Sequence, residues 1–355
     1  MLFNLFNKDN LIATFRIETT EYGVNCIMLN VVNKSLLPID LRDLRVWIES
    51  RYILTHRNNI KTFYSVLGIT KLEEFVDITH CVSLKDTFWA QRNGGKLRWK
   101  NVSPYTNPLN KVVADYSFDR KINGKNITGS PDFSTDGNFP KCWKRVNGVL
   151  RLYKAGSSGA SNAGNEPYSE VYATKVAELL GVSHVPYEID TYKDKLVSKC
   201  DCMCNEGVGF ISYRDCTDSY EADFEKLLRD FNYSKEILDM LLLDFMTCNV
   251  DRHYGNFGFL VDNNLNKVIG LAPIFDNNLS CIPYYTTDEP LEYYINDICA
   301  KDGRTWSELF DLIDCDYVRH KLNLFKIRYT YIKVTPKRDK IVNNMIKYQL
   351  LRIKN

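Results

Sequence analysis

The stretch NVDRHYGNFGFLVDNNLNKVIGLAPIFDNNLS, residues 249–280, carries the most informative pattern in the chain. Near its start, Asp251 and Asn256 are separated by four residues. Two strand-like runs, FGFLV and KVIGL, then flank the turn sequence DNNLN. A hairpin over these runs would return Asp276 to the side of Asn256, because both positions are equally far from residue 266 in the turn. The sequence therefore predicts that three oxygen-bearing side chains converge at one end of a hairpin.

Such a convergence suits phosphoryl transfer. Mg²⁺ prefers oxygen ligands and needs only one or two from the protein when phosphates and water complete its shell. We predict Asn256 and Asp276 as magnesium ligands, and Asp251 as the group that accepts or orients the proton of an attacking hydroxyl. The Asp-x4-Asn spacing is also that of kinase catalytic loops. Because polar loops of Asp, Asn and His are common, this motif alone does not decide the function.

A lysine and a glutamate upstream add to this pattern. Residues 141–154, KCWKRV-NG-VLRLYK, read as two strands joined by an Asn-Gly hairpin turn, and the second strand carries Lys154. Glu170 falls in a predicted helix that begins near Asn165 and ends at Gly181. In kinases a strand lysine contacts nucleotide phosphates and is held by a helix glutamate. Taken singly, the two residues read more simply as a solvated lysine and a surface carboxylate, and it is their order along the chain that favours a kinase.

The order of elements predicts an α+β fold with the two lobes of a protein kinase. Residues 1–115 contain strand-like and helix-like pieces without recognisable chemistry, and we interpret them as an accessory region, part of or packed on the N-lobe. Residues 116–200 are predicted to complete a mixed α/β N-lobe with an antiparallel sheet, a Gly- and Ser-rich loop, the lysine strand and the glutamate helix. Residues 201–355 are predicted to form a mainly helical C-lobe with the catalytic loop and the metal-binding hairpin.

These motifs together resemble those of HipA-family serine/threonine kinases. The likeness rests on DRH followed by Asn in DRHYGN, on the later PIFD, and on a lysine strand after a Ser-bearing loop, and it covers approximately residues 125–330. The layout is also similar to stand-alone HipA-like kinases of the cell-translocating type. The resemblance implies ATP and Mg²⁺ as cofactors, with Asp251 as the catalytic aspartate, Asn256 and Asp276 as metal ligands, and Lys154 and His253 close to the ATP phosphates.

Two further parts of the site are implied by the resemblance alone. The linker near residues 197–202, with Lys199 and Cys200, would hold the adenine through backbone groups. The segment DFSTDGN would correspond to a phosphate loop that becomes autophosphorylated, with its candidate positions at Ser134, Thr135 and Gly137. The chain has no GxGxxG before Lys154 and no DFG at Asp276, so phosphate binding by backbone N–H groups is left open.

The predicted function is that of an ATP- and Mg-dependent serine/threonine protein kinase that phosphorylates itself on the 130–137 loop. Members of the wider family act as toxins of toxin–antitoxin pairs, so the resemblance makes an antitoxin a candidate partner, while the protein substrate stays unknown. Two alternatives remain open. One is a kinase of a small molecule or lipid, which would use the same Lys, Asp, Asn and Asp geometry, and the other is an ATP-binding pseudokinase regulator.

Bulk properties limit the partners. The 46 Lys and Arg nearly balance the 44 Asp and Glu, so the net charge of +2 provides no global field for nucleic acid or an anionic membrane. We find no basic recognition helix in the sequence, which argues against direct DNA binding. The start MLFNLFNKDN does not read as a secretory signal, and the apolar run 237–246 is too short to span a bilayer. We therefore expect a cytoplasmic protein, and leave a secreted effector open.

The 11 cysteines are scattered along the chain, which fits reduced thiols better than a disulfide framework. Cys200, Cys202 and Cys204 alternate in a strand-like run, so we expect all three on one face of a strand. No fourth ligand with a zinc-site spacing follows them, and the structural interpretation is preferred.

Overall fold

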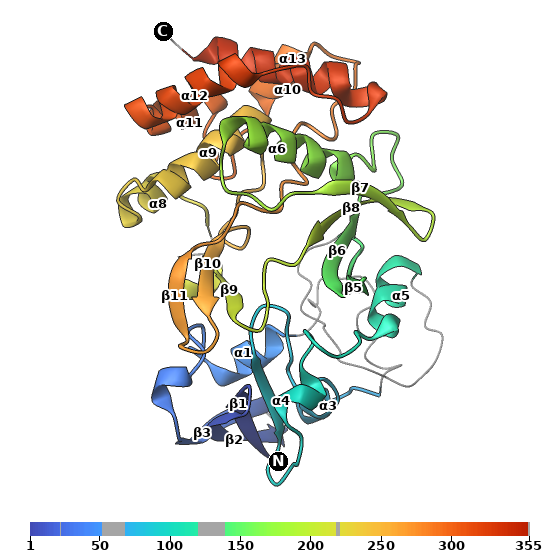
Figure 1. Cartoon of the computed structure of the whole chain (residues 1–355), viewed down its shortest axis with the longest axis vertical. Helices are drawn as coiled ribbons and strands as arrows, with labels where there is room; N and C mark the ends of the chain where they lie inside the picture. The colour runs from blue at the N-terminus through green and yellow to red at the C-terminus, as the bar shows by residue number, and fades with distance from the viewer. Residues whose placement is uncertain (22, 52–67, 120–138, 218–220, 354–355) are drawn as a thin grey trace. The chain divides into compact units, whose positions relative to one another are not determined.

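The computed structural model describes residues 1–21, 23–51, 68–119, 139–217 and 221–353 (Figure 1). The chain forms two compact units, each assembled from three segments. The first unit comprises Met1–Tyr153, Asp201–Ile211 and Phe259–Gly270. The second comprises Lys154–Cys200, Ser212–Gly258 and Leu271–Asn355. The predicted catalytic loop and Asp276 therefore belong to the same unit as Lys154 and Glu170.

An antiparallel sheet of order β3-β2-β1-β4 organises the first unit. Its strands are β1 (Leu2–Asn7), β2 (Asn10–Thr20), β3 (Gly23–Val31) and β4 (Phe88–Arg92). Alternate residues of β1 are buried, as expected of a strand with one face on a core. The helices α1 (Leu44–Glu49) and α3 (Leu72–Thr79) contribute to that core, in which Phe3, Trp47 and Phe75 are almost completely buried.

A second sheet of the first unit, of order β11-β10-β9, contains the predicted hairpin. Its strands are β9 (Val208–Ser212), β10 (Gly258–Asp262) and β11 (Lys267–Leu271). The Asp262 side chain accepts hydrogen bonds from the backbone N–H groups of Asn264 and Leu265 at 2.8 and 2.9 Å, and so closes the turn between β10 and β11. The hairpin predicted from FGFLV, DNNLN and KVIGL is confirmed.

The Asn-Gly hairpin is confirmed as well. It joins β5 (Lys141–Val146) to β6 (Val149–Ala155). Asn147 and Gly148 have φ angles of 52° and 82°, the left-handed values that a two-residue turn of this type requires and that Asn and Gly tolerate. The remaining elements among the described residues of the first unit are short: η1 (Lys34–Leu36), α4 (Trp99–Val102) and α5 (Lys111–Asp119).

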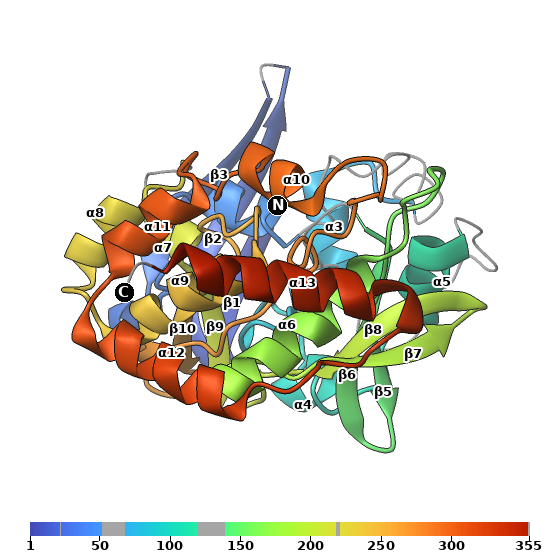
Figure 2. The same cartoon turned by 90° about the horizontal axis from the view of Figure 1, so that it is seen from above.

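The second unit is mainly helical. Its helix α9 (Lys235–Thr247) is apolar on most sides and packs against α6 (Glu166–Leu180), α11 (Trp306–Ile313), α12 (Asp316–Arg328) and α13 (Pro336–Arg352) (Figures 1 and 2). A helix that is hydrophobic all round belongs in a core, and ten of the α9 side chains are buried. The other helices are α7 (Tyr213–Cys216), α8 (Phe224–Asp230) and α10 (Leu291–Asp297).

Helix α6 has the ends that the sequence predicts. Asn165 is its N-cap, and Gly181 ends it in the left-handed conformation at φ 66°. A hairpin of β7 (Glu188–Tyr192) and β8 (Lys195–Asp201) follows.

The expectation for the cysteine run was wrong. Because β8 ends at Asp201, Cys202 and Cys204 lie beyond the strand rather than on its face, and only Cys200 belongs to it. None of the eleven cysteines forms a disulfide. Within the described ranges, no group of three or more His, Cys, Asp or Glu is arranged to hold a metal ion. None of the described helices is both long and apolar enough to cross a bilayer.

Candidate active site

Lys154, Glu170 and Asp276 form one ionic cluster in the second unit. The Nζ atom of Lys154, near the end of β6, lies 2.5 Å from a carboxylate oxygen of Glu170 and 2.5 Å from Oδ1 of Asp276. The exposed fractions of the three side chains are 4%, 0% and 22% respectively, so Asp276 is the member that solvent reaches. The strand lysine and the helix glutamate, sixteen residues apart, are thus brought together with an aspartate from much later in the chain.

The cluster keeps its lysine charged. Burial by itself lowers the pKa of Lys154, but the carboxylates of Asp276 and Glu170 outweigh it and raise the pKa above the ordinary lysine value. Burial raises the pKa of Glu170, whereas Lys154 and the backbone N–H of Asn277, 2.8 Å from Oε2, oppose this rise. The arrangement places a fixed ammonium beside a partly exposed carboxylate, so a ligand at this point would meet both a cation and an oxygen donor.

A buried arginine connects the predicted catalytic loop to the residue before Asp276. Arg252 is fully buried, and its Nη1 donates to the backbone carbonyls of Asn256 at 2.7 Å and Phe275 at 2.8 Å. Its Nε lies 3.0 Å from the carboxylate of Asp244 in α9. One guanidinium therefore ties the loop, the residue before Asp276 and the central helix into a single frame, as a planar five-donor group can.

The sequence analysis assigned no role to Arg252 or Asp244. A signal was present, because Asp244 interrupts the apolar run 237–246, and a carboxylate inside a buried helix needs a charged or hydrogen-bonding partner. What the sequence did not reveal was that the partner is the arginine of DRH.

The amide of Asn256 is oriented by the loop itself. Its Nδ2 donates to the backbone carbonyl of Asp251 at 2.9 Å, which leaves Oδ1 as the oxygen that can serve a cation. Asp276 adopts a left-handed backbone at φ 56°, a conformation that Asp and Asn tolerate better than most residues. One amide oxygen and one carboxylate suit Mg²⁺, because phosphates and water can supply its other ligands.

His253 lies beside Asp251 in the loop. Burial lowers the pKa of His253, and Lys301 lowers it further against the opposing effect of Asp251. The Nδ1 atom accepts a hydrogen bond from the N–H of Gly255 at 3.0 Å, so the neutral ring carries its proton on Nε2. That atom is 4.0 Å from Oδ2 of Asp251, which is too far for a hydrogen bond.

Lys301 contacts the predicted catalytic carboxylate. Its Nζ lies 2.8 Å from Oδ1 of Asp251, although the two residues are fifty positions apart. The sequence analysis missed Lys301. No local pattern could have found it, since the contact depends on how the turn after α10 folds back onto the predicted catalytic loop.

The remaining predicted residues have different surroundings. Lys199 in β8 pairs with Asp190 at 3.0 Å and Glu188 at 3.6 Å across the β7–β8 hairpin, and Cys200 is buried. Their expected role was through backbone groups, and it stays a prediction. Ser134, Thr135 and Gly137 lie outside the described residues.

Part of the chain is similar in sequence to a known protein kinase. No protein-family model matches the chain. The serine/threonine-protein kinase CtkA of Helicobacter pylori is 27% identical over 164 residues, which are 40% of this chain and 49% of CtkA. The chain therefore spans about half the length of this curated relative.

Two solved structures were also compared. A HipA structure from Shewanella oneidensis MR-1, solved with HipB and operator DNA, covers 99% of this chain and 96% of its own with a TM-score of 0.57 and 11% identity. The structure of the Helicobacter pylori proinflammatory kinase CtkA covers 60% of this chain and 90% of its own at 16% identity, but its TM-score of 0.42 is too low to establish a shared fold. The chain thus has a mixed α+β fold similar to that of HipA and a sequence segment similar to CtkA, and its resemblance to the HipA-like/CtkA serine/threonine kinase family is confirmed.

Proposed function

We propose that this protein is an ATP-dependent serine/threonine protein kinase of the HipA-like type. The observation that carries the proposal is the contact of Lys154 with both Glu170 and Asp276. A kinase needs a strand lysine held by a helix glutamate to bind nucleotide phosphates, next to an aspartate that serves the metal. The likeness to CtkA supports the choice of serine and threonine as acceptors.

Each predicted residue then has a role in the transfer. Lys154 contacts the ATP phosphates, and Asn256 and Asp276 hold Mg²⁺, which when bound neutralises charge on the phosphates. Asp251 orients the acceptor hydroxyl and takes its proton. A bond forms between the hydroxyl oxygen and the γ-phosphorus, the bond from that phosphorus to the β–γ bridging oxygen breaks, and ADP leaves with the electron pair.

Finer features of the proposal come from the family resemblance. They include the two-lobed arrangement with parts at residues 1–115, 116–200 and 201–355, adenine binding near Lys199 and Cys200, and autophosphorylation on the 130–137 loop. A role as the toxin of a toxin–antitoxin pair, with an antitoxin as partner, is supported by the HipA structure solved with HipB. A cytoplasmic location is a further part of the proposal.

The test is transfer of labelled phosphate. The purified chain is incubated with γ-labelled ATP and Mg²⁺, alone and with a generic Ser/Thr protein substrate. We expect label on protein from the wild type and none from Asp251→Asn or Asp276→Asn, since each removes a carboxylate required for transfer. Asp288→Asn, at an exposed position, is the matched control and should retain activity.

Calorimetric titration with ATP separates the alternatives. Asp251→Asn should bind ATP as the wild type does, because Asp251 acts on the acceptor. ATP binding without any transfer by the wild type would favour a pseudokinase, and transfer only to a small molecule or lipid would favour the other alternative. A wild-type chain that binds no ATP would contradict the proposal.

A further inference from the structure

A turn far from the catalytic loop in sequence supplies a cation to the predicted catalytic aspartate. Lys301 and Asp251 are 39% and 26% exposed, so the pair lies where an acceptor substrate can reach it. We propose that Lys301 is a positioning residue, which fixes Oδ1 of Asp251 and thereby presents Oδ2 to the acceptor hydroxyl. This inference rests on the proposed function and adds a residue that the DRHxxN motif does not contain.

The backbone and the carboxylate of Asp251 are held by different groups. Its N–H donates to Oδ1 of Asn249 at 3.1 Å, and its carbonyl accepts from the N–H of His253 at 2.8 Å and from the Asn256 amide at 2.9 Å. These bonds fix the main chain of Asp251 but do not restrain its side-chain torsions. The 2.8 Å contact of Lys301 with Oδ1 restrains those torsions, while Oδ2 faces His253 at a distance too long for a bond.

The turn that carries Lys301 is tightly closed. The N–H of Ala300 donates to the carbonyl of Arg304 at 2.8 Å, and the N–H of Gly303 donates to the carbonyl of Ala300 at 2.9 Å. Gly303 has a φ of 85°, which favours glycine over a side chain with Cβ. Ala300 is only 5% exposed, so the turn is anchored at its base.

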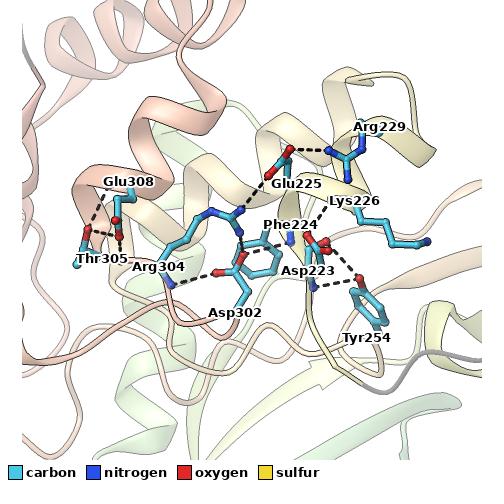
Figure 3. Close-up of polar contacts among 10 residues, drawn as sticks. All are labelled: Asp223, Phe224, Glu225, Lys226, Arg229, Tyr254, Asp302, Arg304, Thr305 and Glu308. Carbon is cyan, nitrogen blue, oxygen red and sulfur yellow. Dashed lines mark hydrogen bonds and ion pairs between the residues drawn. The ribbon is translucent and has the colours of Figure 1, made fainter.

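A buried carboxylate attaches this turn to α8. The side chain of Asp302 is 2% exposed and accepts hydrogen bonds from the N–H of Phe224 at 3.2 Å, from the N–H of Arg304 at 3.3 Å and from the Arg304 guanidinium (Figure 3). Arg304 also lies 3.4 Å from Glu225. A charge this deeply buried persists only when it is paired and hydrogen-bonded, and Asp302 meets that condition.

The N-terminal end of α8, which holds the Lys301 turn, is also hydrogen-bonded to the catalytic loop. Asp223, the N-cap of α8, donates its N–H to the hydroxyl of Tyr254 at 3.1 Å, and that hydroxyl lies 3.2 Å from the carbonyl of Asp223 (Figure 3). Tyr254 is 2% exposed and follows Asp251 by three residues. The turn that carries Lys301 and the loop that carries Asp251 are therefore both hydrogen-bonded to the same end of α8.

The exposure of the Lys301–Asp251 ion pair indicates what Lys301 contributes. An ion pair this exposed adds little to stability, because solvent screens it and ordering the side chains costs entropy. Orientation of a reacting group can matter far more, since a small misplacement can lower the rate about a hundredfold. Lys301 should therefore affect turnover more than folding or ATP affinity.

The experiment compares Lys301→Met, Lys301→Arg and the wild type in steady-state transfer assays. We expect Lys301→Met to lower kcat by about tenfold or more, with KM for ATP within about twofold and an unchanged melting temperature. Lys301→Arg should recover part of kcat, because it restores the cation. Lys340→Met, at an exposed position of α13, is the matched control and should match the wild type. A Lys301→Met enzyme with wild-type kcat would overturn the inference.

A second measurement does not need activity. The rate at which an amine-acylating reagent labels Lys301, read by mass spectrometry, should rise in Asp251→Ala because the carboxylate no longer holds the ammonium. An unchanged rate overturns the Lys301–Asp251 pairing on its own. A faster rate together with a wild type that transfers no phosphate would instead refute the proposed function, and the catalytic role of Lys301 with it.

Discussion

At the scale of single residues, the cluster of Lys154, Glu170 and Asp276 is costly to the fold. Burying charges requires desolvation that their mutual attraction only partly offsets, and apolar residues of similar volume often stabilise a protein more. Glu170 is fully buried and Lys154 nearly so. Because packing alone would not select such a group, its presence agrees with a binding role.

The cost can be measured by removing the cation. Lys154→Met should reduce the free energy of unfolding by about 3–5 kcal/mol, because Glu170 is left as an uncompensated buried charge. The double variant Lys154→Met/Glu170→Gln should recover part of that loss, since the second change removes the charge. Urea denaturation of both variants gives the comparison. Lys175→Met, in an exposed pair on the same helix, should change little. A double variant less stable than Lys154→Met would contradict this account.

At the scale of elements, the sequence predicted the turns and helix ends that depend on a few neighbouring residues. The Asn-Gly dipeptide at 147–148, the caps of α6 and the turn between β10 and β11 were predicted because each depends on a few adjacent residues. Helix α13 was not assigned, although Val342, Met345 and Ile346 recur at helical spacing and are buried.

Contacts between distant segments could not be predicted in this way. The bonds of Arg252 to α9 and to Phe275 depend on packing, as does the turn that presents Lys301. The candidate site was therefore predictable as a set of residue types, and its supporting frame was not.

Helix α13 is linked to α6 by one carboxylate, which leads to a prediction on pH. Oδ1 of Asp339 accepts hydrogen bonds from the hydroxyl of Tyr172 at 2.5 Å and from the N–H groups of Val334 at 2.8 Å and Thr335 at 3.0 Å. Burial raises the pKa of Asp339, but these donors outweigh it and hold the pKa below its ordinary value of 3.8. The stability from Asp339 is therefore present above that value and is lost as the pH falls through the folded pKa.

Asp339→Asn should consequently lower the melting temperature by about 2–4 °C at pH 7, the effect of one weakened hydrogen-bonded group in a chain of this size. The difference from the wild type should shrink as the pH falls below 3.8 and through the lowered folded pKa, where the wild-type carboxyl becomes protonated. Thermal unfolding at several pH values tests both statements. Asp316→Asn, exposed in the first turn of α12, is the control and should show no such difference at either pH. A gap that widens in acid would refute the assignment.

At the scale of the whole molecule, neither unit is a continuous piece of chain. The first unit combines residues 1–153 with two later segments, which supply β9, β10 and β11. Asn7 donates through its side chain to the carbonyl of Asn263 at 2.8 Å, and the N–H of Phe210 donates to the carbonyl of Lys85 at 2.7 Å. The N-terminal region thus shares a unit with strands that follow the predicted lysine strand and glutamate helix in sequence.

This arrangement predicts that residues 1–115 cannot be removed without damage. In a 116–355 chain the edge of β9 would lose its partner at Lys85, and Phe210, now 8% exposed, would face water. An uncovered strand edge beside apolar side chains is prone to associate with other chains. We therefore expect the truncated chain to melt at a lower temperature than the full chain and to elute as aggregates in size-exclusion chromatography. A separately produced 1–115 fragment, added during refolding, should restore a discrete complex, because the lost hydrogen bonds and apolar contacts need no covalent link. A 116–355 chain that stays monomeric with an unchanged melting temperature would show that the N-terminal region is an independent accessory.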